Sequence, residues 1–336
     1  MFIRTCVNIL LTGGTGYIGT HLTVLLQQFG HNLVLYDNLH NSRKNVLAKI
    51  KAITNIKPTF IYGDLLDTRL LSKTLSQFHI DTVIHLGASK SIEESYHVPI
   101  AYYENNIAGS LHLFKAMQES DVHSLIFASS SAVYGDAQAL PIKEQHPKNP
   151  INPYGRSKLY IEQILTDIVN SYSDWQVVLL RYFNIAGAHE SGILNESPCE
   201  AAQNIFSVLR EVSLGKRTSL PVYGNNYSTK DGTTVRDYVH VMDLAKAHQN
   251  VLQWMAAHNT PLEDFNLGSG VATSILDVVK VYETCTKQKI HYDFHPPRVG
   301  DVAQSYACIE KAHDKLNWQP EKSLQDMCES FLKAGL

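Results

Sequence analysis

The chain has 336 residues, 44% hydrophobic and 18% charged, an ordinary composition for a protein that buries a sizeable core. It carries 29 Lys and Arg against 32 Asp and Glu, a net charge of -3, without a basic run, which argues against nucleic acid as a partner. No apolar run approaches the roughly 20 residues that span a bilayer, so no membrane partner is expected either.

The five cysteines lie far apart in the sequence, with no Cys-x-x-Cys pair and no spacing to histidine that would suit a metal: Cys6, Cys199, Cys285, Cys308 and Cys328. We therefore expect reduced thiols, a cytoplasmic location and no metal site. Two of the 16 histidines, His85 and His240, lie in apolar runs and are expected to be hydrogen-bonded core residues.

Short apolar or β-branched runs alternate with helical patterns through the first half of the chain. The runs cover residues 7–11, 32–37, 58–64, 81–87, 124–130 and 176–183, and helices are expected from Tyr17 and over 153–171. This alternation is typical of βαβ units, so the predicted fold class is α/β, with a Rossmann-type doubly wound parallel sheet. Ligands of such sheets bind beyond the carboxyl ends of the strands.

After Asn184 the pattern loosens into polar loops between helices such as 243–257 and 275–285. We predict two domains: a dinucleotide-binding Rossmann domain over 1–184 and a smaller C-terminal α/β lobe for the substrate over 185–336, with some chain crossing back to the first domain. Because no long linker separates them, the two are expected to share an interface.

A glycine loop joins the first predicted strand to the first helix, with Gly13, Gly16 and Gly19 spaced three apart. Absent side chains let a pyrophosphate approach the backbone, and the helix N-terminus offers amide donors. Asp37 follows 18 residues after Gly19, at the end of the next strand, where a carboxylate accepts ribose hydroxyls and repels a 2′-phosphate. The pattern favours NAD over NADP, although a tight turn with glycines for packing is the structural alternative.

The helix predicted over 153–171 begins with Asn152 as N-cap and Pro153 at its first position. Its apolar stripe, when extended towards the N-terminus, reaches Lys158 and Tyr154. A buried ammonium needs a partner, which predicts a polar or anionic ligand nearby. The alternative is that Lys158 extends to solvent along the helix start.

Three serines, Ser129 to Ser131, follow the fifth predicted strand at the expected ligand edge. Alone they indicate a capped turn, but together with Tyr154 and Lys158 they predict one crevice. For Tyr154 to act as a base near neutrality its pKa must fall by about three units from about 10, roughly 4 kcal/mol. A unit charge about 4 Å away supplies about that much at an effective dielectric of about 20, so Lys158 is expected to be sufficient.

These motifs resemble the extended short-chain dehydrogenase/reductase family, and within it the UDP-glucose 4-epimerase family, along nearly the whole chain. The matching segments include TGGTGYIGTH, YDNLHNS, SSSAVYG, NPYGRSK, LLRYFN, GAHESG and VRDYVHVMDLA. The resemblance implies that Tyr154 takes the proton from the sugar O4 and that Ser130 holds the same hydroxyl. Lys158 would bind the cofactor ribose beside the phenol.

The resemblance also implies a tightly bound NAD and a set of residues that contact it. These cofactor-binding residues are Gly13, Gly16, Tyr17, Ile18, Gly19, Asp37, Asn38, Leu39, His40, Asn41, Ser42, Asp64, Leu65, Leu86, Gly87, Ala88, Ser89, Lys90, Asn105, Ser130, Tyr154, Lys158 and Phe183. A homodimer through helices near 102–119 and 152–171 is implied as well.

For a UDP-sugar substrate the resemblance implies a second set, mostly in the C-terminal lobe. Its members are Ser130, Tyr154, Asn184, Asn204, Ile205, Pro221, Val222, Tyr223, Arg236, Arg298, Asp301 and Ser305. Arginines suit a diphosphate because their planar donors bind pairs of oxygens. Surface ion pairs are the alternative for the two arginines, and an N-cap is the alternative for Asp301.

The chain departs from the family pattern at Leu86 to Ser89 and at Ala202 to Gln203, which puts binding details there in question. Ser305 stands where some relatives carry a large tyrosine, and a small residue there accompanies tolerance of an N-acetyl group. We therefore expect turnover of UDP-N-acetylhexosamines in addition to UDP-glucose and UDP-galactose.

Two other functions fit parts of the pattern. A nucleotide-sugar 4,6-dehydratase begins with the same oxidation but needs an Asp-Glu pair for elimination, where this chain has Ser131 and Ala132. A redox sensor or scaffold would keep the dinucleotide fold without needing Ser130, Tyr154 and Lys158 together. Replacing Tyr154 by Phe separates a sensor from an epimerase.

Overall fold

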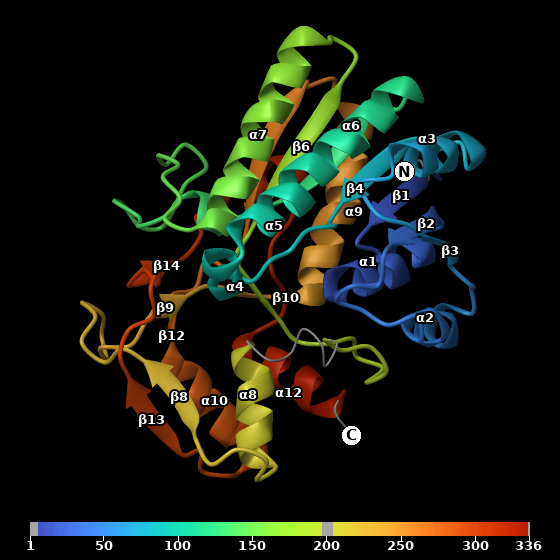
Figure 1. Cartoon of the computed structure of the whole chain (residues 1–336). Helices are drawn as coiled ribbons and strands as arrows, with labels where there is room; N and C mark the ends of the chain where they lie inside the picture. The colour runs from blue at the N-terminus through green and yellow to red at the C-terminus, as the bar shows by residue number, and fades with distance from the viewer. Residues whose placement is uncertain (1–5, 197–203, 335–336) are drawn as a thin grey trace.

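A seven-stranded sheet, all of whose neighbouring strands run parallel, forms the centre of the computed structural model, which describes residues 6–196 and 204–334 (Figure 1). Its spatial order is β11 (Leu262–Leu267), β6 (Gln176–Tyr182), β5 (Ser124–Ser130), β4 (Thr82–His85), β1 (Asn8–Thr12), β2 (Asn32–Asp37) and β3 (Thr59–Tyr62). The predicted parallel α/β sheet is confirmed, with β1 beginning one residue later than expected.

Helices cover both faces of this sheet, and each face has its own apolar core. One face carries α1 (Tyr17–Gln28), α2 (Val46–Thr54), α9 (Val241–Ala257) and α11 (Glu310–Leu316), and the other carries α3 (Thr68–Gln77), α6 (Gly109–Glu119) and α7 (Pro153–Ser171). Leu22 and Trp254 are buried in the first core, and Leu113 and Leu165 in the second. The sheet is therefore doubly wound, as predicted.

The strand order reverses between β1 and β4. After β3 the chain returns to pair β4 on the free side of β1, so the connections after β1 and β4 leave in different directions and open a crevice at their carboxyl ends. His85, at the end of β4, is 1% exposed and bonds Thr12 Oγ1 at 2.6 Å and Ser110 Oγ at 2.9 Å. This histidine is a hydrogen-bonded core residue, as predicted.

Short helices connect the strands beside this crevice. They are α4 (Ile92–His97), α5 (Pro99–Tyr103), a π-helical turn (Glu104–Ala108) and a 3₁₀ turn (Ser131–Val133).

The smaller lobe contains helices α8 (Ile205–Ser213), α10 (Ile275–Thr286) and α12 (Leu324–Lys333), which enclose a third core with Phe206 and Tyr282. Three small sheets accompany them: β7 (Asn184–Ala186) with β10 (Tyr238–His240), β9 (Val235–Arg236) with β12 (Thr273–Ser274) and β14 (Gln304–Ser305), and β8 (Leu220–Tyr223) with β13 (Tyr292–His295). Figure 1 shows β9, β12 and β14 between this lobe and the main sheet. The division at residue 184 stays a prediction, and α9, β11 and α11 belong to the main sheet's layers.

Helix α7 has the predicted bounds and the predicted cap. The Asn152 side chain accepts a hydrogen bond from the Gly155 amide at 2.7 Å, and Pro153 is the first helical residue. Ile161 is buried in the core between the sheet and helices α3, α6 and α7, and Lys158 on the same face of α7 is only 3% exposed. The alternative that Lys158 extends to solvent is therefore wrong.

Replacing Asn152 by Ala should lower the free energy of unfolding by about 1 kcal/mol, because a first-turn amide of α7 loses its acceptor in a region closed to water. Urea unfolding of the purified protein measures this change. Asn152→Asp keeps the acceptor and serves as the control with most of the stability retained. An Asn152→Ala variant as stable as the parent would contradict the role of the cap.

Candidate active site

The glycine loop lies at the carboxyl end of β1 and leaves no room for side chains. Gly13 has a φ of +67°, and a Cβ there would lie 2.9 Å from the Gly87 amide nitrogen. A Cβ on Gly19 would lie 2.5 Å from the Gly13 carbonyl oxygen. Gly16 is the N-cap of α1 and offers no side-chain acceptor, so the first amides of this helix are available to an anion. The loop fits a dinucleotide pyrophosphate.

A cavity at this loop brings together most of the predicted cofactor residues from four strand ends. Its lining includes Gly13, Gly16, Tyr17, Ile18, Gly19, Asp37, Asn38, His40, Asn41, Ser42, Leu65, Leu86, Gly87, Ala88, Ser89, Lys90 and Asn105. The departure from the family pattern at Leu86 to Ser89 therefore falls in the cavity wall.

Six predicted cofactor residues lie outside that lining: Ser130 at the end of β5, Tyr154 and Lys158 on α7, and Leu39, Asp64 and Phe183. The Leu39 amide donates to Asp37 Oδ1 at 2.8 Å, and Asp64 Oδ2 accepts from the Asn38 side chain at 2.9 Å, so both support residues of the wall. Phe183 is buried in a separate apolar cluster with Val133.

Two residues of the lining were not predicted from the sequence, Tyr36 and Gly63. A Cβ on Gly63 would lie 2.4 Å from the Tyr36 ring, so only glycine fits there. The Tyr36 hydroxyl donates to the Asp64 carbonyl at 2.8 Å and fixes the end of β3. The signal in the sequence was the glycine directly before Asp64, at the end of a strand.

Asp37 contributes a negative charge to the cavity wall and also holds the glycine loop. Its Oδ2 accepts the Thr15 amide at 3.1 Å, and its Oδ1 accepts the Leu39 amide. A carboxylate has about four acceptor sites, so capacity remains for ribose hydroxyls. The same charge would repel a 2′-phosphate, which suits NAD.

The three predicted catalytic residues meet where α7 crosses the end of β5. Ser130, the last residue of β5, lies close enough to Tyr154 on the first turn of α7 for its hydroxyl to oppose the raised pKa of that phenol. The Ser130 hydroxyl also accepts the Ala132 amide at 3.2 Å, so the capped turn and the catalytic placement coexist. One turn along α7, Lys158 Nζ donates to the Ala128 carbonyl at 2.7 Å and lies 4.8 Å from the Phe127 ring centre.

The expectation that Lys158 alone makes Tyr154 acidic is wrong. Burial raises the pKa of Tyr154 above its ordinary value, and only the Ser130 hydrogen bond and the charge of Lys90 oppose this. The reason is that burial, the dominant effect, disfavours the phenolate, while the Lys158 ammonium is bonded to a backbone carbonyl. Within the chain alone, Tyr154 stays protonated at neutral pH.

Burial also lowers the pKa of Lys158 to about 7, against the opposing charge of Glu162. The amine therefore titrates in the physiological range, and a small change in nearby charge alters its protonation. Burial dominates the pKa of both Lys158 and Tyr154, so a charge bound beside either group would change its protonation.

In the smaller lobe, Arg236 and Arg298 share the carboxylate of Asp301. Arg236 Nη2 lies 3.4 Å from Asp301 Oδ1, and Arg298 Nε lies 3.3 Å from Asp301 Oδ2. Arg298 also stacks on the Tyr223 ring at 4.5 Å. Two cations with one anion leave a net positive charge that fits a diphosphate. Asp301 makes these ion pairs and caps no helix among those described.

The other predicted substrate residues are spread over strand and helix ends of the smaller lobe. Asn184 begins β7, Asn204 caps α8 before Ile205, Pro221 to Tyr223 lie in β8, and Ser305 on β14 pairs with Arg236 on β9. Ala202 and Gln203 lie outside the described residues.

Glu196 connects the two sets of predicted residues, and sequence reasoning missed it. Its Oε1 lies 3.8 Å from Lys90 Nζ in the cofactor cavity, and its Oε2 accepts from the Asn204 side chain at 2.8 Å. No motif marks this residue, because the contact joins segments more than 100 residues apart in the sequence.

The Arg298–Asp301 segment also contacts the first domain beside α7. A Cβ on Gly300 would lie 2.5 Å from the Tyr96 hydroxyl, which donates to the Ile151 carbonyl at 3.0 Å, directly before the α7 cap. The diphosphate candidates and the catalytic helix therefore border one crevice.

Within 6–196 and 204–334, no helix has the length and apolar character needed to cross a membrane. The same residues contain no cluster of His, Cys, Asp and Glu that could hold a metal ion.

Known proteins match this chain over nearly its whole length. The family model described as GDP-mannose 4,6 dehydratase matches residues 10–331. The UDP-glucose 4-epimerase of Bacillus subtilis is 41% identical over 320 residues, which are 95% of this chain and 94% of that protein.

Two solved structures have the same fold. The UDP-glucose 4-epimerase from Stenotrophomonas maltophila, with bound NAD and formylated UDP-arabinopyranose, has a TM-score of 0.95 at 38% identity, covering 98% of this chain and 97% of that one. The enzyme from Bifidobacterium longum, in complex with NAD+ and UDP, has a TM-score of 0.94 at 40% identity and covers 97% of both chains. Because relatives with 38–41% identity cover nearly the whole chain, this chain belongs to the UDP-glucose 4-epimerase family of extended short-chain dehydrogenase/reductases.

Proposed function

We propose that this protein is an NAD-dependent UDP-glucose 4-epimerase, which interconverts UDP-glucose and UDP-galactose. The observation that carries the proposal is the meeting of Ser130, Tyr154 and Lys158 at the end of β5, next to a cavity with the glycine loop. The relatives with NAD and UDP bound support the same cofactor and substrate class.

In this reaction Tyr154 takes the proton from the sugar O4 and later returns it, while Ser130 holds the same oxygen. When bound, NAD would accept the C4 hydride, return it to the opposite face and place positive charge near the Tyr154 phenol. Such a charge would oppose the raised pKa of Tyr154 that burial causes. The Ala128 carbonyl fixes Lys158 one helical turn beyond Tyr154, where the resemblance to the family assigns it to the cofactor ribose.

Return of hydride to the other face requires the hexose to rotate while the nucleotide stays bound. We assign the nucleotide anchor to Arg236 and Arg298, which hold a diphosphate through paired donors. Binding energy should therefore lie in the uridine and diphosphate, with few polar contacts to the hexose.

A 4,6-dehydratase is the alternative that the description of the matching family model brings forward. Its elimination needs an acid-base pair after the strand-end hydroxyl, and this chain has Ser131 and Ala132 in a 3₁₀ turn there. An assay of the products formed from UDP-glucose separates the two functions, because a dehydratase would release a 4-keto-6-deoxy sugar.

Replacing Tyr154 by Phe should reduce kcat for UDP-galactose by about 10²- to 10⁴-fold, because the proton acceptor is lost. Bound NAD, measured after denaturing the purified variant, should remain near the parent level, since the glycine loop is intact. Tyr172→Phe, at an exposed position just beyond α7, is the matched control with full activity. A Tyr154→Phe enzyme that turns over normally would refute the proposed mechanism.

Substrate range is the next part of the proposal. Ser305 lies on β14 beside Arg236, so its small side chain leaves space near the proposed diphosphate anchor. We expect the purified enzyme to convert UDP-N-acetylglucosamine to UDP-N-acetylgalactosamine. Ser305→Tyr should reduce this activity at least about tenfold, because the bulky side chain would fill the space that the N-acetyl group needs, at a cost of about 1–3 kcal/mol. Turnover of UDP-galactose by Ser305→Tyr should change little. A parent enzyme that does not convert the N-acetyl sugar would contradict this part of the proposal.

We also infer a homodimer in a reducing cytoplasm. The four described cysteines are free thiols. Exposed apolar side chains gather on α5, α6 and α7: Ile100 is 81%, Leu111 46% and Tyr160 44% exposed. Tyr160 also stacks near Tyr103, so the patch joins α5 to α7. A contiguous exposed apolar patch of this kind marks an interaction surface.

Replacing Leu111 by Glu should split the dimer, because a charge would be buried in the interface. Light scattering after gel filtration should change from twice the chain mass of 37.6 kDa to a single chain mass. Val271→Glu, an exposed apolar position in the smaller lobe, is the control that should leave the mass unchanged. A parent protein that already runs as a monomer would contradict the dimer.

A further inference from the structure

Three consecutive residues at the end of β5 each act on a different residue of α7. The Ala128 carbonyl accepts a hydrogen bond from Lys158 Nζ at 2.7 Å, and the Ser129 hydroxyl donates to Glu162 at 2.5 Å. The Ser130 hydroxyl lies close enough to Tyr154 to oppose its raised pKa. The three α7 residues are four apart, so they lie along one face of the helix. Two of these contacts hold proposed catalytic residues, and the mechanism above gives the third, at Glu162, no role.

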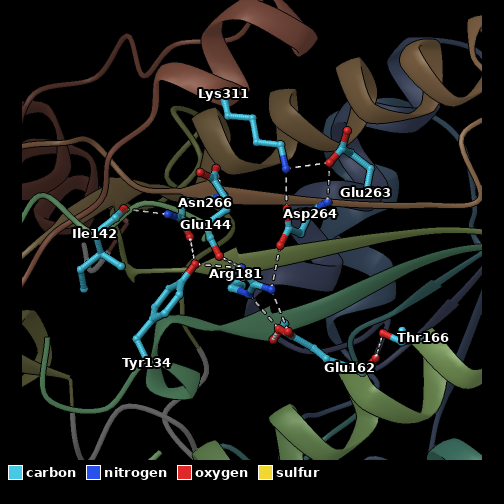
Figure 2. Close-up of polar contacts among 11 residues, drawn as sticks. Tyr134, Ile142, Glu144, Glu162, Thr166, Arg181, Glu263, Asp264, Asn266 and Lys311 are labelled. Atoms are coloured by element: carbon cyan, nitrogen blue, oxygen red, sulfur yellow. Dashed lines mark hydrogen bonds and ion pairs between the residues drawn. The ribbon is translucent and has the colours of Figure 1, made fainter. Parts of the chain in front are cut away.

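Glu162 is bound to a buried arginine as well. Arg181 is 1% exposed and grips both Glu162 oxygens, with Nε at 2.9 Å from Oε1 and Nη2 at 2.8 Å from Oε2. Its other donors reach the Tyr134 hydroxyl at 2.9 Å, the Glu144 carbonyl at 3.1 Å and the Asp264 carboxylate at 2.9 Å (Figure 2). The guanidinium thus has all five N–H groups engaged.

This arrangement fixes Glu162 in place without exposing it. Figure 2 shows the carboxylate pointing from α7 towards Arg181 on β6, with Asp264 and Lys311 on the far side of the guanidinium. A buried ion pair is weak evidence for stability, because desolvation offsets its attraction. The position of Glu162 is better explained by a role in aligning the catalytic residues and in setting the protonation of Lys158.

Glu162 is also the charged residue that acts most directly on Lys158. It lies one turn further along α7, and its carboxylate raises the pKa of Lys158 against the lowering by burial. Arg181 keeps that carboxylate at a fixed distance from the amine. Asp264 binds the same guanidinium but has no such influence on Lys158.

We propose that Glu162 is a positioning residue of the epimerase reaction: fixed by Arg181 and Ser129, it aligns α7 with the end of β5 and supplies the negative charge that favours the ammonium form of Lys158. This inference rests on the proposed function. The ionisable groups whose charges act on Lys158 or respond to it are Glu162 on α7 and His85 on β4, while Tyr182 on β6 responds to Tyr154. His85 is neutral, because burial and Lys158 lower its pKa to about 3, and burial raises the pKa of Tyr182.

The test is the pH profile of kcat for UDP-galactose in the holoenzyme, compared between Glu162→Gln and Asp264→Asn. Both variants remove one carboxylate from Arg181, so both should lower the thermal midpoint. Only Glu162→Gln removes the charge that acts on Lys158, which favours the free amine. The limb of its profile that reports Lys158 should move to lower pH by about one unit, while the Asp264→Asn profile stays in place.

Glu162→Asp keeps the charge on a shorter side chain, so kcat should fall through misalignment while the profile remains where it was. A Glu162→Gln profile that coincides with that of Asp264→Asn would overturn the proposal and leave Glu162 a structural residue.

Glu162→Gln leaves a buried guanidinium short of one charge and could fail to fold. In that case the double variant Glu162→Met with Arg181→Met carries the test, because exchanging both partners of a buried pair is tolerated better than removing one. Its profile should also move to lower pH, by less than one unit, since the nearer charge is the one that acts on Lys158. A profile at the parent position would overturn the proposal, whereas a parent enzyme without UDP-galactose turnover would overturn the proposed function instead.

Discussion

The registration of α7 against the end of β5 is the constraint on which the rest of this site depends. Tyr154 can receive a proton from a sugar only if its hydroxyl stays beside Ser130, and the helix carries both Tyr154 and Lys158. The Asn152 cap and Pro153 fix where the helix starts, so a change in either would displace both side chains. The backbone of β5 and the start of α7 therefore determine the catalytic geometry together.

The same packing shifts the pKa values of Tyr154 and Lys158 away from their ordinary values, and a bound ligand would have to offset these shifts. Enclosing Lys158 and Tyr154 disfavours the charged form of each, which lowers the pKa of one and raises that of the other. With its raised pKa, the Tyr154 phenol is a poor base by itself. A positive charge bound beside it would lower that pKa and make the phenolate available. This dependence suits a catalyst whose cofactor stays bound, because the reactive state then exists only in the holoenzyme.

The crevice has two walls that different parts of the chain supply. One wall follows from the reversal of strand order between β1 and β4, and the other from the Arg236, Arg298 and Asp301 cluster of the smaller lobe. Contacts such as Glu196 with Lys90 and Gly300 with Tyr96 hold the walls together. In the proposed reaction the nucleotide would be bound on one side and the cofactor on the other, which would leave the sugar between them free to rotate.

The sequence by itself determined the strands, the bounds of α7 and the identity of the cofactor loop, because periodicity, caps and glycine spacing are local properties of neighbouring residues. Ser130 was also recognisable, since the strand ends of a parallel sheet meet at one edge. Tyr154 and Lys158 were recognisable from their four-residue spacing on the predicted helix. Only the tertiary structure decided the contacts between distant segments, such as Arg181 with Asp264 or Glu196 with Lys90. It also decided the direction of the Tyr154 pKa, because desolvation depends on everything packed around a group, whereas sequence spacing reveals only its neighbour along the helix.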